Sequence, residues 1–294
     1  MMSHSAPKSQ TSTALCEKMR VKIHCQNMII ERLWPANAWR NYHYLIACSE
    51  TGEALAVDPL DWQLCESTAR ARGWTLTQIL NTHEHRDHIG GNEPLREATG
   101  ARVLAHAGAG GRIPGLDRGL AHGDIIKIGR TVELECLDTP GHTRSHLCLL
   151  ARGRSASAPP ELLCGDTLFN AGAGNCHNGG DPDLLYQTFV DCLARLPDAT
   201  RIHPGHDYLV RNLAFTLDRE PDNRDAAALL ATVQSRDGAS APVTTIGDER
   251  RLNTFFRLKN PQVIAKLREV FKDLPAEPDT RTVFLRLREL RNRW

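Results

Sequence analysis

Several features that mark particular protein classes are missing from this 294-residue chain. No apolar run reaches the roughly 18 residues that a hydrophobic membrane-spanning helix needs. The 36 Lys and Arg residues nearly balance the 35 Asp and Glu residues, so the formal charge of +1 gives no global attraction to nucleic acid or to an anionic membrane. Internal repeats and long low-complexity tracts are also absent. We therefore expect a globular protein whose partners include neither a nucleic acid nor a membrane.

The nine cysteines include no Cys-x-x-Cys pair, and their number is odd. In a chain of this length that pattern favours reduced thiols in a cytosol over a disulfide framework, so a cytoplasmic location is expected. None of the cysteines has the spacing of a zinc-thiolate site. Four of them lie in apolar, strand-like stretches and are expected to be small buried residues: Cys48, Cys136, Cys148 and Cys164.

Residues 1–27 differ in character from the rest of the chain. They carry Ser, Thr, Lys and Gln, with no sustained apolar period, and they lack the apolar core of a secretion signal. Their basic, Ser/Thr-containing composition is shared by organellar transit segments, which leaves that alternative open. We favour a disordered extension, with the folded part beginning at Met28.

From residue 28 to about residue 206 the hydrophobic pattern alternates between strands and helices. Strands are expected at 28–33, 42–48, 53–57, 76–82, 103–105, 125–128, 132–137, 147–150, 162–164 and 201–203, and helices at 62–72, 92–99 and 184–196. From 207 onward only helical periodicity remains, at 209–217, 225–235, 261–271 and 282–293. The sequence thus predicts an α/β domain over 28–206 and a helical domain over 207–294.

The last predicted helix carries one apolar stripe, made of Val283, Leu287, Leu290 and Trp294. Its arginines lie largely off that stripe. The pattern is typical of an amphipathic helix docked on the protein, with its basic face in solvent.

The segment 83–88, His-Glu-His-Arg-Asp-His, is the most informative feature of the chain. It places three imidazoles and a carboxylate within six residues, directly after an apolar strand-like run and before the Gly90-Gly91 break. Imidazole and carboxylate groups bind zinc, iron or manganese. The alternative is a His-rich solvated loop, and other clusters along the chain weigh against it.

Four further clusters follow predicted strands, and each sets a ligand-type side chain beside a Gly or a Pro. They contain Asp58, His142, Asp166 and His206, within the segments 58–59, 140–143, 165–169 and 204–208. Strand ends allow a sheet-based fold to bring together side chains that are distant in sequence. The pattern predicts that these four residues converge on the 83–88 segment.

From about Met28 to the C-terminus, the chain resembles the glyoxalase II (hydroxyacylglutathione hydrolase) family of metallo-β-lactamase-fold hydrolases. Segments 82–88, 141–143, 165–169 and 204–208 carry the resemblance to that fold. Segments 212–215 (Asn-Leu-Ala-Phe) and 253–257 (Asn-Thr-Phe-Phe-Arg) point to the glyoxalase II branch. The resemblance implies an αββα sandwich with two metal ions at one edge, followed by a helical domain.

The resemblance also implies roles for individual residues. A first metal would be held by His83, His85 and His142, a second by Asp87, His88 and His206, with Asp166 between the two. Three protein ligands and a bridge leave each ion an open position for water or substrate. Asp58 and His146 are expected to lie behind the ligands and to orient them.

The implied reaction is thioester hydrolysis, converting S-D-lactoylglutathione to D-lactate and glutathione. Hydroxide made available by the two ions would attack the carbonyl carbon, with Asp87 and Asp166 orienting it as well as ligating. The departing thiol has a pKa near 8.5, so it leaves as a thiolate without a separate general acid. Zinc is the favoured metal, and iron and manganese remain open.

Substrate anchors are expected from five residues. By motif position, Tyr208 and Arg257 match residues that hold the glutathione carboxylates in the family, and Lys259 is a third expected anchor. In the loop after Phe169, where the family has a basic and an aromatic residue, this chain has Asn175 and His177. A protonated His177 would restore part of the missing charge.

Other functions remain open at this point. A mononuclear-iron relative, glutathione persulfide dioxygenase, would use His83, His142 and Asp166 for a single iron. Other branches of the fold hydrolyse lactones, β-lactams or phosphodiesters. A non-enzymatic metal-bound scaffold would not need an open metal position. The sequence leaves the oligomeric state open.

Overall fold

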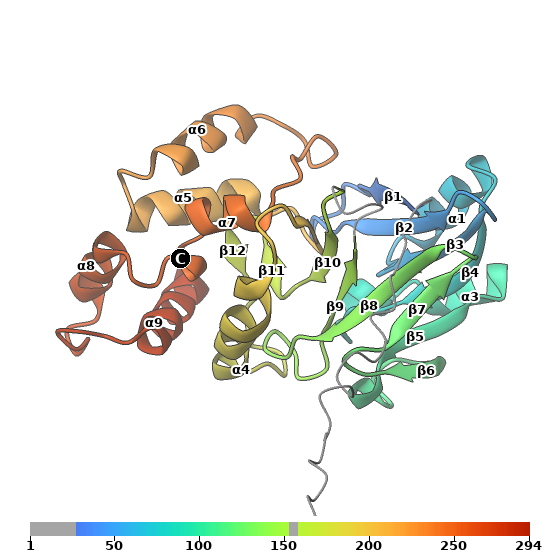
Figure 1. Ribbon diagram of the computed structural model, residues 1–294, viewed down its shortest axis with the longest axis horizontal. Coiled ribbons are helices and arrows are strands. Elements are labelled where there is room, and N and C mark those ends of the chain that lie inside the picture. The colour runs from blue at the N-terminus through green and yellow to red at the C-terminus, as the bar shows by residue number, and fades with distance from the viewer. Residues whose placement is uncertain (1–27, 153–157) are drawn as a thin grey trace, which may run out of the picture.

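Two mixed β-sheets face each other in the computed structural model, which describes residues 28–152 and 158–294 (Figure 1). The first has the strand order β1 (Met28–Leu33), β2 (His43–Cys48), β3 (Glu53–Val57), β4 (Thr75–Leu80), β5 (Arg102–His106), β6 (Leu116–Leu120). The second has the order β13 (Arg201–Pro204), β10 (Glu161–Gly165), β9 (Leu147–Ala151), β8 (Val132–Asp138), β7 (Ile125–Ile128). A short hairpin, β11 (Leu168–Phe169) with β12 (Gly172–Ala173), stands apart from both sheets.

The alternation of side chains along β2 explains why this strand is buried on both faces. Tyr44, Ile46 and Cys48 point into the core between the two sheets. Leu45 and Ala47 point to the outer face of the first sheet, into a second apolar cluster. Because successive residues of a strand face opposite sides, an apolar run buries both faces only when another layer covers each of them.

Helices supply those outer layers (Figure 1). On the first sheet lie α1 (Trp62–Ala71) and α3 (Asn92–Thr99), and on the second lie α4 (Pro182–Gln187) and α9 (Thr280–Arg293). The other helices after the sandwich are α5 (Leu209–Arg219), α6 (Arg224–Val233), α7 (Ile246–Leu252) and α8 (Pro261–Val270). The predicted αββα sandwich followed by helices is confirmed.

Strand direction decides where the loops gather. β3 and β4 are parallel neighbours, so the loops after them leave the same edge of the first sheet. β8 and β10 are both antiparallel to β9, and β13 is parallel to β10, so these three strands also end at one edge. The five segments that carry the predicted metal ligands and Asp58 all follow one of these strands.

Some predicted elements differ from those observed. The helix expected over 184–196 is α-helical only up to Gln187 and continues as a π-turn (Thr188–Cys192) and a 3-10 turn (Leu193–Arg195). The α-helical winding gives way to π-helical winding at Thr188, whose hydroxyl donates to the Pro140 carbonyl, 2.7 Å away. The sequence analysis missed β6 and α7. The expected disordered extension, 1–27, lies outside the described residues.

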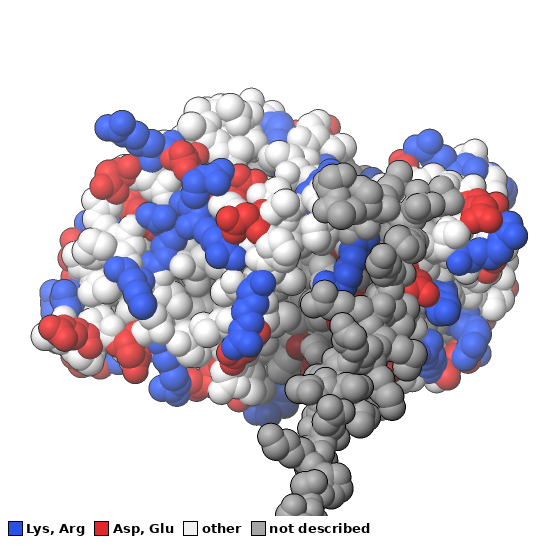
Figure 2. All heavy atoms as spheres, viewed as in Figure 1, with Lys and Arg blue, Asp and Glu red and all other residues white. Residues whose placement is uncertain are grey.

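Lys and Arg are interspersed with Asp and Glu over the face shown in Figure 2. No helix within 28–152 and 158–294 has the length and apolar character needed to cross a membrane. The four cysteines expected to be buried are buried. All seven cysteines in the described ranges are free thiols.

Candidate metal centre

Seven side chains from four loops meet at the shared edge of the two sheets. They form three overlapping groups, within each of which the candidate ligand atoms lie within 4.8 Å of one another. The groups are His83, His85 and His142; His83, His88 and Asp166; and Asp87, His88 and His206. The seven residues predicted as ligands from separate motifs are therefore neighbours in space.

In the first group, three ring nitrogens face a common point. His83 Nε2 and His142 Nε2 each lie 3.0 Å from His85 Nδ1. The rings of His83 and His142 stand nearly perpendicular to the ring of His85. For comparison, nitrogens about 2.0–2.1 Å from a tetrahedral zinc ion are separated by roughly 3.3 Å.

In the second group, His88 Nε2 and His206 Nε2 are 3.2 Å apart. Asp87 Oδ2 lies 3.6 Å from the first of these nitrogens and 3.3 Å from the second. The Asn41 amide donates to the same carboxylate oxygen at 3.2 Å, which fixes its orientation.

Asp166 lies between the two groups. Its Oδ2 is 3.5 Å from His142 Nε2 and 3.2 Å from His206 Nε2, and its Oδ1 is 3.5 Å from His88 Nε2. Oδ1 is buried and makes no hydrogen bond within the described part of the chain. An unsatisfied buried carboxylate oxygen is costly unless a cation occupies the space it faces.

The hydrogen bonds on the outer side of each histidine ring show which of its two nitrogens remains available to bind a metal ion. His142 Nδ1 faces the Asn175 carbonyl at 2.6 Å and His206 Nδ1 faces the Trp39 carbonyl at 2.8 Å. His85 Nε2 faces the Asn178 carbonyl at 3.0 Å. Because a carbonyl oxygen only accepts, these three nitrogens carry the protons, and the opposite nitrogens present lone pairs to the centre.

Asp58 imposes the same arrangement on the remaining two rings. Its carboxylate accepts from Thr82 N at 2.8 Å, from the Thr82 hydroxyl at 2.7 Å and from His88 Nδ1 at 3.0 Å. Since that hydroxyl donates to Asp58, its oxygen accepts from His83 Nδ1, 3.0 Å away. Five imidazole lone pairs and two carboxylates thus converge on one space, a donor set that fits divalent cations.

His146 contacts the centre at two points, because its ring stacks on the His83 ring, with centroids 5.2 Å apart, and it hydrogen-bonds to the backbone of Asp166. Its Nε2 accepts from the Asp166 backbone N–H at 3.1 Å, and its Nδ1 lies 2.9 Å from the Thr139 hydroxyl. His146 therefore positions the loop that carries Asp166.

The protonation of the cluster reflects its charges. Burial lowers the pKa of His142 to about 4 and holds the pKa of His83 well below its ordinary value, so both rings are neutral at pH 7, the form that binds metal. Burial opposes protonation of His206, but the carboxylates of Asp166 and Asp87 outweigh it and raise its pKa to about 10, so at pH 7 its Nε2 carries a proton that a bound cation would displace to expose the lone pair. The two carboxylates thus attract positive charge to this space.

Glycines in the motifs permit the close packing around the centre. Gly165 has a φ of +45°, and a Cβ there would lie 2.7 Å from both His146 Nε2 and Thr82 Oγ1. A Cβ on Gly205 would lie 2.3 Å from Asp166 Oδ1 and 3.0 Å from His88 Cε1. Real side chains do not approach this closely, so the loops converge only with glycine at these positions.

Of the five predicted substrate anchors, three share a cavity of about 270 Å³ that opens beside the metal centre: Asn175, His177 and Tyr208. The Tyr208 ring stacks on the His206 ring, with centroids 5.0 Å apart, and its hydroxyl donates to the Trp39 carbonyl at 3.3 Å. A residue that lines the cavity therefore packs directly on a predicted ligand.

The other two predicted anchors, Arg257 and Lys259, do not line this cavity, so the structure does not bring the five residues together. Both residues line a separate surface hollow next to the 3-10 turn Thr254–Phe256. The reason lies in Glu220, whose buried carboxylate is 2.8 Å from Arg257 Nε and already pairs with that guanidinium.

Three arginines that the sequence analysis did not single out line the cavity instead: Arg211, Arg288 and Arg291. The expectation that the arginines of the last helix form a solvated face was wrong for Arg288, which is 5% exposed. Its guanidinium donates to the carbonyls of Ala173 and Gly174 at 2.7 and 2.9 Å. Nothing in the sequence beyond helical spacing marks these arginines.

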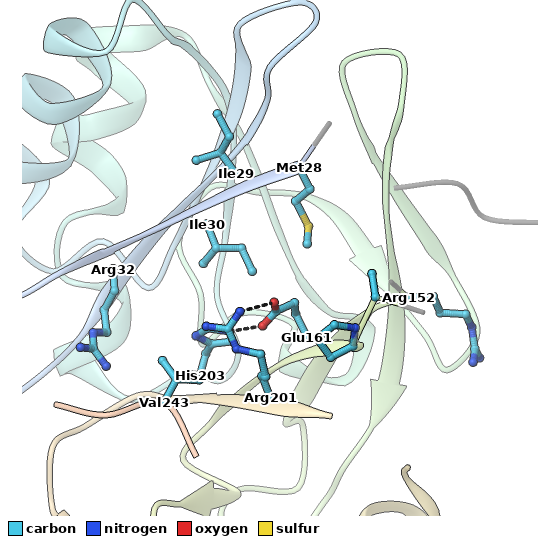
Figure 3. A pocket seen from close by; sticks show the side chains of 11 residues that line it. Met28, Ile29, Ile30, Arg32, Arg152, Glu161, Arg201, His203 and Val243 are labelled. Carbon is cyan, nitrogen blue, oxygen red and sulfur yellow. Dashed lines mark hydrogen bonds and ion pairs between the residues drawn. The ribbon is translucent and has the colours of Figure 1, made fainter. Parts of the chain in front are cut away.

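A second cavity, of about 550 Å³, lies between β1 and the edge of the other sheet (Figure 3). Figure 3 shows Arg201 and His203 pointing to Glu161, with N–O distances of 3.0 and 2.7 Å. His203 is thus held by a hydrogen bond to Glu161. The charged groups of this cavity already have protein partners, including Arg32, which donates to the Ala241 carbonyl.

Comparisons with known proteins match both parts of the chain. Residues 44–206 match the metallo-beta-lactamase superfamily, and residues 207–294 match the hydroxyacylglutathione hydrolase C-terminus. Hydroxyacylglutathione hydrolases from Polaromonas sp. and Nitrosococcus oceani are each 62% identical over 267 residues, covering 91% of this chain and 100% of theirs.

Solved structures share the fold at lower identity. ETHE1 from Myxococcus xanthus superposes with a TM-score of 0.62 at 27% identity, covering 85% of this chain and 93% of its own. A metallo-beta-lactamase from Staphylococcus aureus also has a TM-score of 0.62, at 23% identity, covering 90% of this chain and 71% of its own. The second likeness concerns the fold alone.

Proposed function

The chain belongs to the hydroxyacylglutathione hydrolase family of the metallo-β-lactamase superfamily, and from this premise we propose that it hydrolyses S-D-lactoylglutathione to D-lactate and glutathione. The observation that carries the proposal is the placement of Asp166 between two groups of histidines, with every histidine lone pair directed inward. A site with three ligands on either side of a shared carboxylate suits two divalent cations.

We assign the ligands as the sequence suggested. One cation would be held by His83, His85 and His142, the other by Asp87, His88 and His206, and Asp166 would serve both. Bound divalent cations supply Lewis acidity and lower the pKa of a coordinated water to about 7. Mixed imidazole and carboxylate donors favour zinc and also accommodate iron and manganese.

The chain's own residues would then position the reactants. The Asp87 and Asp166 carboxylates would accept hydrogen bonds from the attacking water or hydroxide and orient it toward the thioester carbon. Asp58 keeps the protons of His83 and His88 on the outer side of their rings. A glutathione thiol with a pKa near 8.5 departs as the thiolate, so the cavity needs no acidic side chain beside the leaving group.

The two domains of the chain would have different roles in the reaction. We propose that residues 28–206 form the metal-bearing domain and residues 207–294 the domain that recognises the peptide portion of the substrate. Tyr208, Asn175 and His177 line the cavity beside the metal centre, where the peptide would lie. We also propose a cytoplasmic location, supported by the free thiols of the described cysteines.

The test is a hydrolysis panel run with metal analysis on the same sample. The proposal requires release of glutathione from S-D-lactoylglutathione well above the rate with free metal, at about two metal ions per chain. A His206→Ala variant should fold but lose turnover and metal. One iron per chain with oxygen consumption on glutathione persulfide, and no thioester hydrolysis, would replace the proposal with the dioxygenase alternative.

A further inference from the structure

A buried carboxylate, that of Asp207, directly follows the predicted ligand His206 and contacts two arginines. Its side chain is 2% exposed. Arg236 donates from Nη2 to Oδ1 at 2.7 Å and from Nη1 to Oδ2 at 3.1 Å, a two-point contact between a planar guanidinium and a carboxylate. Arg40 Nη2 donates to Oδ2 at 2.5 Å. We refer to Arg40, Asp207 and Arg236 as the Asp207 triad.

The triad joins three segments that are distant in sequence. Arg40 lies between β1 and β2, Asp207 follows β13, and Arg236 follows α6 in the helical part of the chain. The Arg236 side chain is 9% exposed, whereas that of Arg40 is 46% exposed. A buried charge needs its partners, because leaving it unpaired is strongly destabilising. Arg236 therefore fixes the position of the Asp207 carboxylate, and that carboxylate fixes the position of Arg40.

The contact between Arg40 and Asp207 also includes the backbone. The Asp207 N–H donates to the Arg40 carbonyl at 3.0 Å, and Arg40 Nε donates to the Asp207 carbonyl at 2.8 Å. Arg40 has a φ of +61°, in the left-handed region that residues other than glycine seldom adopt. Such a conformation costs free energy and persists only where surrounding contacts hold it. The contacts with Asp207 hold it here.

The residues on either side of Arg40 contact two of the predicted metal ligands. The Trp39 carbonyl accepts from His206 Nδ1 at 2.8 Å. The Asn41 amide donates to Asp87 Oδ2 at 3.2 Å. Both ligands belong to the cation assigned to Asp87, His88 and His206, which we call the second cation. Since partners of this kind orient the ligands and raise metal affinity, the backbone conformation at Arg40 bears on two ligands of one cation.

The ligands assigned to the other cation, the first, have their outer partners elsewhere. Those partners are Thr82 for His83, the Asn178 carbonyl for His85 and the Asn175 carbonyl for His142. None of them lies in the segment 39–41. A disturbance of the Asp207 triad should therefore affect the two cations unequally.

We infer that Arg40 and Arg236 are positioning residues for the second cation. Acting through Asp207, they hold the segment 39–41 against His206 and Asp87. This inference rests on the proposed function, through its ligand assignment, and extends it. The helical part of the chain, which supplies Arg236, thus contributes to the metal centre as well as to substrate recognition.

The experiment exposes the zinc-loaded, full-length protein to rising concentrations of a fluorescent chelator and records the metal ions lost per chain. Release in two steps gives an affinity for each cation. Arg236→Gln should weaken one affinity about 10-fold and leave the other within about twofold. The weakened affinity should be the one that Asp87→Ala lowers most, and not the one that His85→Ala lowers most.

Three further variants separate positioning from folding. Arg40→Asn removes the guanidinium but adopts the left-handed conformation readily, so it should also weaken the second cation selectively. Arg236→Lys keeps the charge but not the two-point contact, and it should recover part of the affinity. The control is Arg251→Gln. Arg251 also pairs with two carboxylates of the helical part, Asp225 and Asp248, and its replacement should leave both affinities within about twofold.

Thermal unfolding of the same samples shows which variants are folded, and Arg40→Asn decides the question if Arg236→Gln is not. A folded variant of either arginine that keeps both affinities within twofold would overturn the inference. So would an equal loss at both cations, because a general loosening of the fold has that effect.

The inference can fail or survive independently of the hydrolysis proposal, since no thioester is present in the chelator assay. Selective weakening of the second cation supports the positioning role even if no thioester is hydrolysed. Hydrolysis of S-D-lactoylglutathione by a protein whose metal affinities are unaffected by Arg236→Gln overturns the positioning role and leaves the activity standing. An unmodified protein that binds only one cation would overturn both the ligand assignment and the inference.

Discussion

Replacing Asp58 with Asn exchanges one carboxylate oxygen for an NH2 group at the residue that sets the protonation of the candidate metal centre. The carboxylate accepts three hydrogen bonds, two from Thr82 and one from His88 Nδ1. An amide offers a single acceptor. If its oxygen faces Thr82 N, its NH2 group faces His88, which can then only accept at Nδ1. The proton of His88 moves to Nε2, the atom directed at the metal centre.

The expected cost follows from the role of such partners. Loss of a group that orients a ligating histidine weakens metal binding about 10- to 100-fold, or roughly 1.4–2.7 kcal/mol. Folding should persist, because Asp58 has a φ of 50° and Asn adopts this left-handed conformation readily. The assay is metal affinity by competition with a fluorescent chelator, with thermal unfolding recorded on the same samples.

A matched control lies three residues away. Asp61 caps α1 by accepting from Leu64 N at 3.0 Å, and Asn caps a helix about as well as Asp. Asp61→Asn should therefore keep both its fold and its metal affinity. If a folded Asp58→Asn protein bound metal within twofold of the unmodified protein, the argument that Asp58 fixes the histidine protons would be refuted.

Three more substitutions test other parts of the structure. Burial raises the pKa of Glu249 to about 7 from an ordinary 4.5, so its contribution to the free energy of unfolding is greatest below pH 4.5 and declines as pH rises toward 7. Urea unfolding should therefore show Glu249→Gln gaining about 3 kcal/mol relative to the unmodified protein between pH 4.5 and pH 7.5, and a pH-independent difference would contradict this. Gly205→Ala, whose Cβ would overlap Asp166 Oδ1, should abolish metal binding in a chelator assay, whereas Gly110→Ala, with no contact closer than 3.8 Å, should keep it. Arg257→Gln should lower the free energy of unfolding by about 2 kcal/mol, because it leaves the buried Glu220 carboxylate without its cation. KM for S-D-lactoylglutathione should stay unchanged. A large increase in KM would instead show that Arg257 anchors the substrate.

Short motifs made the family and the fold predictable, and both predictions are confirmed. The convergence of the predicted ligands could be foreseen because each follows a strand, and the ends of parallel strands meet at one edge. The helix α7 could also have been found. Thr245 and Asp248 form a capping box at its start, a pattern visible in the sequence. β6 left no such mark, since its residues 117–119 are exposed and show no alternation.

The lining of the substrate cavity could not be predicted in the same way. Helical spacing places Arg288 and Arg291 beside the apolar stripe of α9, but their environment depends on which neighbour the helix docks against. The backbone carbonyls of Ala173 and Gly174 become partners of Arg288 only in the folded chain. Contacts between a side chain and distant backbone carbonyls leave no periodic pattern in the sequence, so sequence analysis places such arginines in solvent.

The segment 253–257, which points to one branch of the superfamily, has a structural role that the sequence did not suggest. The Asn253 amide donates to the Gly172 carbonyl at 3.0 Å and to Glu249 Oε2 at 2.9 Å, and that same oxygen accepts from Ala171 N. These bonds fix the β11–β12 hairpin, from which the chain runs directly to Asn175. The Asn175 carbonyl in turn holds His142 Nδ1. Because this continuous series of hydrogen bonds joins the helical region to a candidate metal ligand, a change at Asn253 should alter metal binding as well as substrate affinity.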